Sequence, residues 1–275
     1  MMRGAKMSDA RIREYAAEDV PELIRLWTAV FDDTASMAER FFAALPDIGG
    51  GVVALLNGKI AGAAYTINGQ ELICGDKHTP IGYIYGVGVL EKYRHRGIGE
   101  KLVKAICELS RKLGAEVLSC LPAEEGLYAW YEQLADFKYT MKCEKFTIKS
   151  SPSAEVTRLS AADYMTRREK MLEGETHIRL SERAMDFEKQ LLEEYGGGLF
   201  ASEDGLCAAY NDCGKALARE IIARGRNAAI RAAESVGAAL GTSECELRLP
   251  ASNGGLYVAS DKPLPDGCIW NLTFD

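Results

Sequence analysis

The sequence predicts a mixed α/β (α+β) fold in which amphipathic helices alternate with short strands. Residues 98–113 carry apolar side chains at helical spacing, whereas residues 83–90 form a β-branched and aromatic run. Asn-Gly at 57–58 and Asp-Gly at 204–205 each separate two apolar runs, as in β-hairpins. Similar segments also occur in the same order in both halves of the chain. We therefore expect two related units, each with a mixed sheet.

The composition excludes several classes of protein. The 275 residues suffice for two domains, and 47% hydrophobic with 27% charged residues is typical of a folded soluble protein. No apolar run reaches the ~18 residues of a membrane span, and the N-terminus lacks a signal-like apolar stretch. We therefore expect a cytoplasmic protein without a membrane partner. A net charge of -7 without a dense Lys/Arg tract also argues against nucleic acid as a partner. The oligomeric state stays open.

The cysteines and histidines do not predict a metal site. The eight cysteines are scattered without a CxxC pair, and the three histidines lie far apart in the sequence. We expect the cysteines to be small buried hydrophobic residues, with neither a bound metal nor a disulfide framework.

The elements of the first half follow one another from residue 11 onward. Apolar residues at Leu23, Leu26 and Trp27 predict a helix that follows a short strand within residues 11–30. We then expect, in order, a hairpin over 51–67, a strand over 83–90, a helix over 98–113 ended by Gly114, a strand over 115–121 and a helix over 124–135.

Three segments of the first half have counterparts in the second half. The matched pairs are residues 12–19 with 156–163, the hairpins 49–65 with 196–210, and a helix with Ala-Ile that leads through Gly114 or Gly237 to a strand ending in Leu-Pro-Ala. The polar segment 150–153 separates the copies. We therefore predict two domains, residues 1–149 and residues 150–275, and we expect the chain to end in a strand-like tail.

The two copies differ between the hairpin and the helix. The first copy inserts residues 83–99, YIYGVGVLEKYRHRGIG, whereas the second has only a short Lys/Ala/Arg/Gly segment. If the inserted loop is a binding device, the chain has one site and a degenerate second unit.

The inserted loop has the chemistry of a phosphate site. It joins a buried strand to a helix N-terminus, where unpaired backbone N–H groups and the positive end of the helix dipole favour an anion. Gly97 and Gly99 allow close approach to the backbone, and Arg94, His95 and Arg96 add positive charge. The segment matches neither a Walker loop nor a GxGxxG dinucleotide motif.

The motif RxxGxG at residues 94–99, set between a strand and an amphipathic helix, resembles the signature of the GNAT superfamily of acyl-CoA-dependent N-acyltransferases. The element order over residues 11–148 is similar as well. The resemblance implies a GNAT fold, acetyl-CoA as cosubstrate without a metal, and a bulged strand that hydrogen-bonds to the pantetheine arm. The implied CoA-binding residues are Val87, Gly88, Val89, Arg94, His95, Arg96, Gly97, Ile98, Gly99 and Glu100.

Tyr131 is the candidate catalytic acid. The segment GLYAWYEQLADF resembles the family's Tyr-bearing helix, although Leu134 is followed by two residues rather than one before the phenylalanine. A phenol with a pKa near 10 is protonated at neutral pH and can donate to the departing sulfur. Tyr131 or Tyr128 as a plain core aromatic is the alternative. The general base stays open among Tyr83, Tyr85, Glu124, Glu125 and the C-terminal carboxylate of Asp275.

The second half resembles the degenerate unit of two-unit bacterial acetyltransferases of the enhanced-intracellular-survival type, without their third domain. The resemblance implies transfer of an acetyl group to a primary amine on a small molecule or peptide. Two alternatives remain: a non-catalytic acyl-CoA-binding sensor or interaction protein, and a tandem enzyme that transfers a different acyl group.

Overall fold

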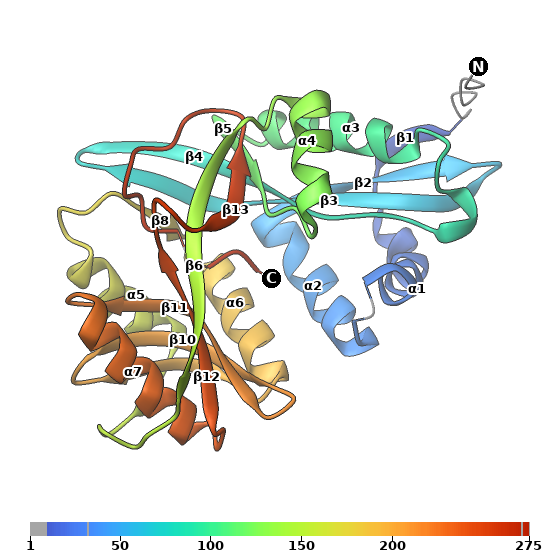
Figure 1. Ribbon diagram of the computed structural model, residues 1–275. Coiled ribbons are helices and arrows are strands. Elements are labelled where there is room, and N and C mark those ends of the chain that lie inside the picture. The colour runs from blue at the N-terminus through green and yellow to red at the C-terminus, as the bar shows by residue number, and fades with distance from the viewer. Residues whose placement is uncertain (1–9, 32, 271, 275) are drawn as a thin grey trace. The chain divides into compact units, whose positions relative to one another are not determined.

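The computed structural model describes residues 10–31, 33–270 and 272–274 (Figure 1). The chain forms two compact units. The first comprises the residues up to Gln70, Thr79–Thr140 and Val258–Pro263. The second comprises Glu71–His78, Met141–Tyr257 and the residues from Leu264 onward.

The first unit contains a mixed sheet in the order β1-β2-β3-β4-β5-β13. β1 pairs antiparallel with β2 and β2 with β3, whereas β4 and β5 are parallel and β13 is antiparallel to β5. The strands are β1 (Arg11–Glu14), β2 (Gly49–Leu56), β3 (Lys59–Cys74), β4 (Lys77–Val89), β5 (Val117–Cys120) and β13 (Gly255–Ser260). Residues 71–78, which are the end of β3, the turn after it and the start of β4, belong to the second unit.

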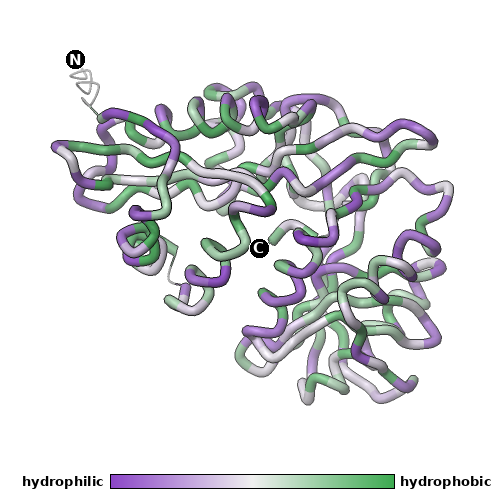
Figure 2. The backbone as a smooth tube through the Cα atoms, turned by 180° about the vertical axis from the view of Figure 1, so that it is seen from behind, coloured by the Kyte–Doolittle hydropathy of each residue, from purple (hydrophilic) through white to green (hydrophobic). Residues whose placement is uncertain are grey.

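Helices cover both faces of the first unit's sheet, α1 and α2 on one and α3 and α4 on the other (Figure 1). Their bounds are α1 (Val20–Phe31), α2 (Ala35–Ile48), α3 (Ile98–Lys112) and α4 (Glu125–Ala135), with a short 3-10 turn η1 (Ala17–Asp19) before α1. α3 buries Ile98, Leu102 and Ile106 in one apolar cluster while its charged residues face outward. Figure 2 shows purple and green segments alternating along such helices.

The second unit contains a sheet in the order β6-β12-β11-β10-β9-β7. β11 and β12 are parallel, and the other pairs are antiparallel. The strands are β6 (Tyr139–Lys149), β7 (Thr157–Leu159), β9 (Gly198–Ser202), β10 (Gly205–Asp212), β11 (Lys215–Ala223) and β12 (Glu244–Pro250), and the short β8 (His177–Leu180) pairs with β3. The helices are α5 (Ala161–Met171), α6 (Glu182–Glu194) and α7 (Arg226–Ala239).

The last strand of each sheet comes from the other half of the sequence. β6 follows α4 along the chain but pairs with β12, whereas Ala259 and Ser260 of β13 pair with β5. Asp261 stabilises the pairing of β13 with β5, because its carboxylate accepts from Leu118 N at 2.8 Å and pairs with Arg111. The predicted division between residues 149 and 150 stays a prediction, since compactness does not show where a repeat ends.

The mixed α/β fold is confirmed, and so are both hairpins, but three local predictions were wrong. β11 occupies the place where only a short connecting segment was expected, so the second copy lacks the loop but keeps the strand. Gly237 lies inside α7, which ends before Gly241 at φ +73°. The tail forms only an isolated bridge at Ile269 within residues 268–270 and 272–274, and Asp275 lies outside the described residues. No sequence pattern had predicted α2 and α6.

Each described helix is too short or too polar to cross a bilayer.

Candidate functional site

The parallel pairing of β4 and β5 ends before β4 does. Its register joins Ile81–Ile84 to Val117–Cys120, and β4 continues to Val89. Gly86 lies just past the last pair and has φ +58°, a left-handed conformation that glycine adopts without strain. The strand is therefore bent where it leaves its neighbour, as expected for a bulge.

Tight packing also favours glycine at Gly86 and Gly88. A Cβ on Gly86 would lie 3.0 Å from atoms of Trp27 and Tyr65. A Cβ on Gly88 would lie 3.0 Å from atoms of α1. Val87 and Val89 are half-buried beside these glycines and pack against the apolar cluster that α3 completes.

The loop from residue 90 to 97 is exposed and contains two left-handed residues. His95 has φ +59° and Gly97 has φ +74°. A Cβ on Gly97 would meet no atom within 4 Å, so space is open above that position. Two side chains brace the loop: Arg94 Nε donates to Val89 O at 3.1 Å, and Arg96 donates to the Lys92 carbonyl at 3.4 Å.

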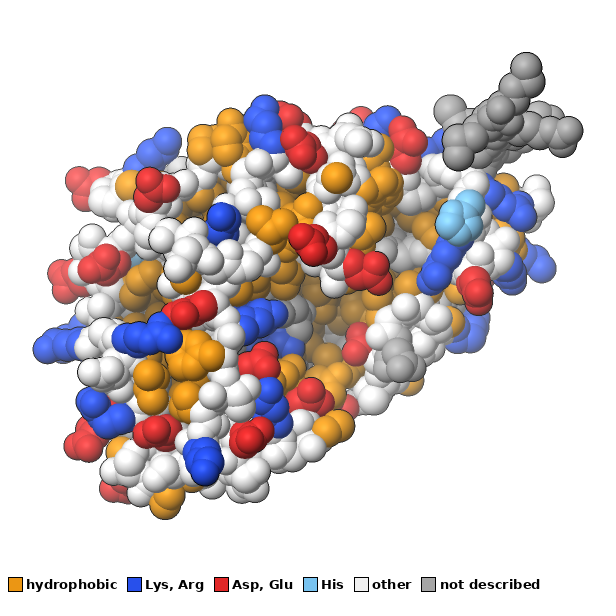
Figure 3. All heavy atoms as spheres, in the orientation of Figure 1, with side chains coloured by type: hydrophobic (Ala, Val, Ile, Leu, Met, Phe, Trp, Pro, Cys, Tyr) orange, Lys and Arg blue, Asp and Glu red, His pale blue; other side chains and the backbone are white. Residues whose placement is uncertain are grey.

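The positive charge of this loop is not neutralised by protein carboxylates. Among the described residues, no acid forms an ion pair with Arg94, His95 or Arg96. Figure 3 shows basic side chains gathered at this end of the first unit. Gly97 is the N-cap of α3 without a side-chain cap, so the first-turn N–H groups lack a side-chain acceptor. Backbone donors and cations together favour an anion here.

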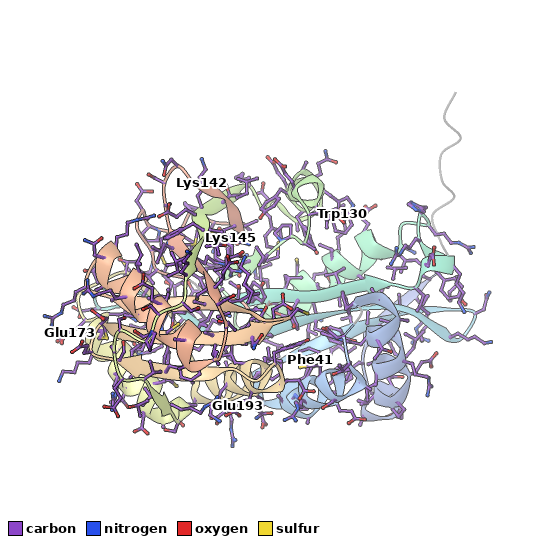
Figure 4. The ribbon with its side chains drawn as sticks, turned by 60° about the horizontal axis from the view of Figure 1, so that its bottom comes forward. Phe41, Trp130, Lys142, Lys145, Glu173 and Glu193 are labelled. Atoms are coloured by element: carbon purple, nitrogen blue, oxygen red, sulfur yellow. The ribbon has the colours of Figure 1, made fainter. Side chains whose placement is uncertain are left out.

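Trp130 on α4 lies beside the end of this loop. A Cβ on Gly99 would be 3.5 Å from Trp130 Cζ2, which places the half-buried indole against the first turn of α3. Figure 4 shows Trp130 on the face of the sheet opposite to Phe41 of α2. Sequence reasoning missed this residue, although it directly precedes Tyr131, because helical spacing did not show that α4 would contact α3 at that turn.

Tyr131 is 8% exposed and lies in the apolar cluster of the first unit. Its ring centroid is 4.9 Å from that of Trp130 and 5.9 Å from that of Phe137. Burial raises the pKa of Tyr131, and the nearby thiols of Cys120 and Cys107 raise it further. The phenol is therefore protonated at neutral pH, as a proton donor must be. Its catalytic role stays a prediction.

The candidate bases lie in different surroundings. Glu124 and Glu125 are exposed at the start of α4, whereas Tyr83 is buried in β4 and Tyr85 is half-buried. The Asp275 carboxylate falls outside the described residues. The geometry does not favour one of these residues over the others as the general base.

An aromatic cluster packs beneath the bend of β4, on the face that α1 and α2 cover. Trp27 is its centre, with ring centroids 4.8 Å from Phe41 and 5.6 Å from Tyr65. The Tyr65 hydroxyl is buried and has no hydrogen-bond partner among the described residues, and burial raises its pKa. This cluster fixes the position of the bend, since Gly86 contacts it directly.

Residues 11–132 match the family model described as an acetyltransferase (GNAT) domain. No curated protein matches the sequence. Solved structures resemble nearly the whole chain. A probable N-acyltransferase from Enterococcus faecalis has a TM-score of 0.67 at 16% identity, covering 92% of this chain and 72% of its own.

Two further structures agree with this resemblance. A GCN5-related N-acetyltransferase from Kribbella flavida has a TM-score of 0.65 at 17% identity, covering 92% of this chain and 71% of its own. Eis1 from Mycobacterium abscessus has a TM-score of 0.59 at 13% identity, with coverages of 90% and 73%. The chain has the GNAT fold.

In this GNAT fold the predicted cofactor-binding residues lie together, from the bend of β4 through the loop to the first turn of α3. The structure shows that these residues are neighbours, whereas the function of each residue stays a prediction. The described residues contain no group of three or more side chains suited to hold a metal ion.

Proposed function

We propose that the protein is an acyl-CoA-dependent N-acetyltransferase that moves an acetyl group from acetyl-CoA to a primary amine on a small molecule or peptide. The observation that carries the proposal is the junction of β4 and α3. There β4 leaves its parallel neighbour β5, and the loop after β4 carries arginines without an acidic partner among the described residues. The helix α3 begins with N–H groups that no side chain caps. The match of residues 11–132 to the acetyltransferase domain supports the same interpretation.

The residues of this junction would hold different parts of the cosubstrate. Backbone N–H groups from His95 to Gly99 would bind the pyrophosphate, because the left-handed residues and the open space at Gly97 leave room for phosphate oxygens, whereas the Arg94 N–H already donates to Glu91 O at 3.1 Å. The backbone of Val87 and Val89 would bind the pantetheine arm beyond the last β4–β5 pair. The open space at Gly97 fits a phosphate group, and the Val89 carbonyl accepts from Arg94 Nε at 3.1 Å.

Acetyl-CoA supplies the activated acyl group, and the protein supplies orientation and a proton. A backbone N–H of β4 near Val87 or Val89 would polarise the carbonyl. Tyr131 would donate its hydroxyl proton to the departing sulfur, and its raised pKa keeps that proton available above neutral pH. The amine must lose a proton before or during attack, and the open candidates for that base are those named above.

We further propose that the second unit is a divergent copy of the first. In each unit an N-terminal strand pairs with a hairpin, followed by a third strand, a helix and a parallel strand: β1-β2-β3-β4-β5 against β7-β9-β10-β11-β12. Asp19 and Asp163, at matched positions of the sequence repeat, each stand at the first helix of their unit. The common order supports one origin for both.

The experiment is a thiol-release assay with acetyl-CoA and a panel of amines, run on the full chain and on Arg94→Gln/Arg96→Gln. We expect amine-dependent release of CoA, with kcat/KM about a hundredfold lower in the variant because neither glutamine can make a charge-assisted hydrogen bond to phosphate. The matched control is Arg25→Gln, which removes an arginine of α1 with no described ion-pair partner.

Three outcomes separate the possible functions. Release that needs propionyl-CoA or a longer thioester would identify another acyl group. CoA binding without release for any amine or thioester would indicate a sensor and contradict an enzyme. Equal activity in the double variant and the wild type would contradict a contribution of the Arg94 and Arg96 side chains to phosphate binding.

A further inference from the structure

Two adjoining cavities lie in the second unit, at the turn between β11 and α7. Their volumes are about 700 Å³ and about 480 Å³. Both linings include Lys170, Met171 and Arg224. The same two cations therefore stand between the cavities, and the larger cavity is of a size that binds cofactors and drug-sized molecules.

The larger cavity lies between two parallel strands that have stopped pairing. The β11–β12 register ends at Ala218 and Leu247, but β11 continues to Ala223 and β12 to Pro250. Residues 221–223 and 249–250 at these free ends line the cavity. These five wall residues are apolar, whereas Glu144, Glu175 and Arg226 of the same lining are charged, so the slot suits a slender arm that carries both apolar and polar groups.

The cations between the cavities have no acidic partners. Lys170 and Arg224 are exposed, and among the described residues neither forms an ion pair or hydrogen bond. Neighbouring arginines are neutralised: Arg226 pairs with Glu144, and Arg231 pairs with Asp204 at 2.5 Å. An anionic group at this place would face two unpaired positive charges, which favours phosphate over a neutral group.

The smaller cavity is lined by several polar and charged side chains. Its lining includes Arg167, Ser202, Glu203 and Asp204 around the β9–β10 turn. The Ser202 hydroxyl is buried and has no hydrogen-bond partner among the described residues. A buried hydroxyl without a partner costs free energy unless a ligand or water supplies one. This compartment therefore suits a polar, hydrogen-bonding head group.

We propose that the second unit binds a phosphate-bearing ligand in three parts: a slender arm with apolar and polar groups in the larger cavity, phosphate at Lys170 and Arg224, and a polar head in the smaller cavity. Coenzyme A and its thioesters have this layout. The site uses side chains, whereas the loop at 90–97 offers backbone N–H groups, so it does not depend on the function proposed for the first unit. The second unit would then have a binding site of its own and would not be a degenerate unit without a ligand.

The test is isothermal titration calorimetry of the full-length chain with coenzyme A. We expect two equivalents in the wild type and one in Lys170→Gln/Arg224→Gln, because removing each charge-assisted hydrogen bond to phosphate lowers the affinity about tenfold. Arg94→Gln/Arg96→Gln should also retain one equivalent, held by the second unit. The matched control is Arg183→Gln on α6, an exposed arginine outside both linings that should leave two equivalents.

The pattern of loss distinguishes this site from the one in the first unit. Loss of one CoA equivalent in Lys170→Gln/Arg224→Gln supports the proposal. If Arg94→Gln/Arg96→Gln leaves the number of bound equivalents unchanged, the function proposed for the first unit fails while the second site is unaffected. An unchanged stoichiometry in Lys170→Gln/Arg224→Gln, or no binding that survives the loop variant, overturns the second site. Equal melting temperatures of the variants, whose altered side chains are exposed, check that folding is intact.

Discussion

The two strand-to-helix junctions differ in the length of chain that each provides. In the first unit β4 ends at Val89 and α3 begins at Ile98, whereas in the second β11 ends at Ala223 and α7 begins at Arg226. A long junction lets left-handed residues turn several N–H groups toward one point. A short one cannot, and there only side chains beside the slot can bind an anion. One element order thus supports two kinds of anion site.

The cores of the units differ as well. The second unit buries a charged network in which Arg168 donates to Glu220, at 2.9 Å from Nη2, and Tyr164 donates to the same carboxylate at 3.0 Å. The first unit instead buries a neutral pair, with the Thr66 hydroxyl donating to Ser110 Oγ at 2.8 Å. A buried charge needs its partner far more than a buried hydroxyl does.

The largest expected effect on stability comes from a substitution that breaks this buried charge network. Arg168→Met leaves the Glu220 carboxylate buried without its cation, with the Tyr164 hydroxyl still donating to it, so we expect the substitution to lower the free energy of unfolding by about 3–5 kcal/mol. Ser110→Ala, the matched change in the first unit, should cost only about 1 kcal/mol. Urea denaturation followed by circular dichroism measures both. A cost for Arg168→Met no larger than that for Ser110→Ala would contradict the contrast between the cores.

The next effect concerns catalysis in the first unit. Tyr131→Phe should lower kcat about 10²-fold or more while leaving the dissociation constant of CoA unchanged, because only the proton donor is removed. Tyr128→Phe, one turn earlier on α4, should keep kcat within about twofold. Stopped-flow thiol release gives kcat, and calorimetry gives the dissociation constant. Equal losses in both variants would mean that Tyr131 is a packing residue.

The same tyrosine predicts a pH profile. Its folded pKa is raised above the unfolded value near 10, so the phenol keeps its proton at every pH below that value. We therefore expect no alkaline decline of kcat from Tyr131 between pH 7 and about 10. A decline near pH 8 that disappears in Tyr131→Phe would contradict this assignment.

A smaller effect compares the two N-cap glycines. Gly97 has φ +74° and Gly225 has φ +90°, so alanine at either position should cost about 1–2 kcal/mol of stability. Only Gly97→Ala should also weaken CoA binding by the first unit, about tenfold, because only that glycine belongs to a junction built on backbone donors. Calorimetry on the Lys170→Gln/Arg224→Gln background isolates that site. If Gly97→Ala and Gly225→Ala weakened CoA binding equally, the proposed difference between the two junctions would be wrong.

The smallest effect compares two matched aspartates at the first helix of each unit. Asp19 accepts from Arg13 at 2.6 and 2.7 Å and from Ala16 N at 2.8 Å, whereas Asp163 accepts from Ser160 Oγ. Asp19→Asn should cost about 1–2 kcal/mol, and Asp163→Asn about 0.5 kcal/mol or less. Thermal unfolding of both variants makes the comparison.

The contribution of Asp19 should depend on pH. The hydrogen bonds from Arg13 lower the pKa of Asp19, although burial alone would raise it. Its stabilising effect is therefore fully present above the unfolded pKa near 3.9 and is lost as pH falls through the lower folded value. The difference in melting temperature between wild type and Asp19→Asn should shrink below about pH 4, and a difference that grows there would contradict this account.

Local patterns predicted most elements, because hairpin turns and amphipathic spacing act over a few residues. The RxxGxG loop was placed at the start of α3 for the same reason. Long-range pairing could not be predicted: nothing near Ala259 shows that it will pair with Cys120, and β11 was missed because Arg219 and Glu220 interrupt its apolar run. The cavity at Arg224 depends on where β11 and β12 stop pairing, which is a property of the fold.

The central claim is that N–H groups from His95 to Gly99 hold a pyrophosphate. Hydrogen–deuterium exchange of that segment, with and without coenzyme A, tests it directly. We predict that saturating CoA slows exchange at these amides about tenfold or more, with the same protection in Lys170→Gln/Arg224→Gln. Unchanged exchange from residue 95 to 99, under conditions where calorimetry shows CoA bound, would contradict it.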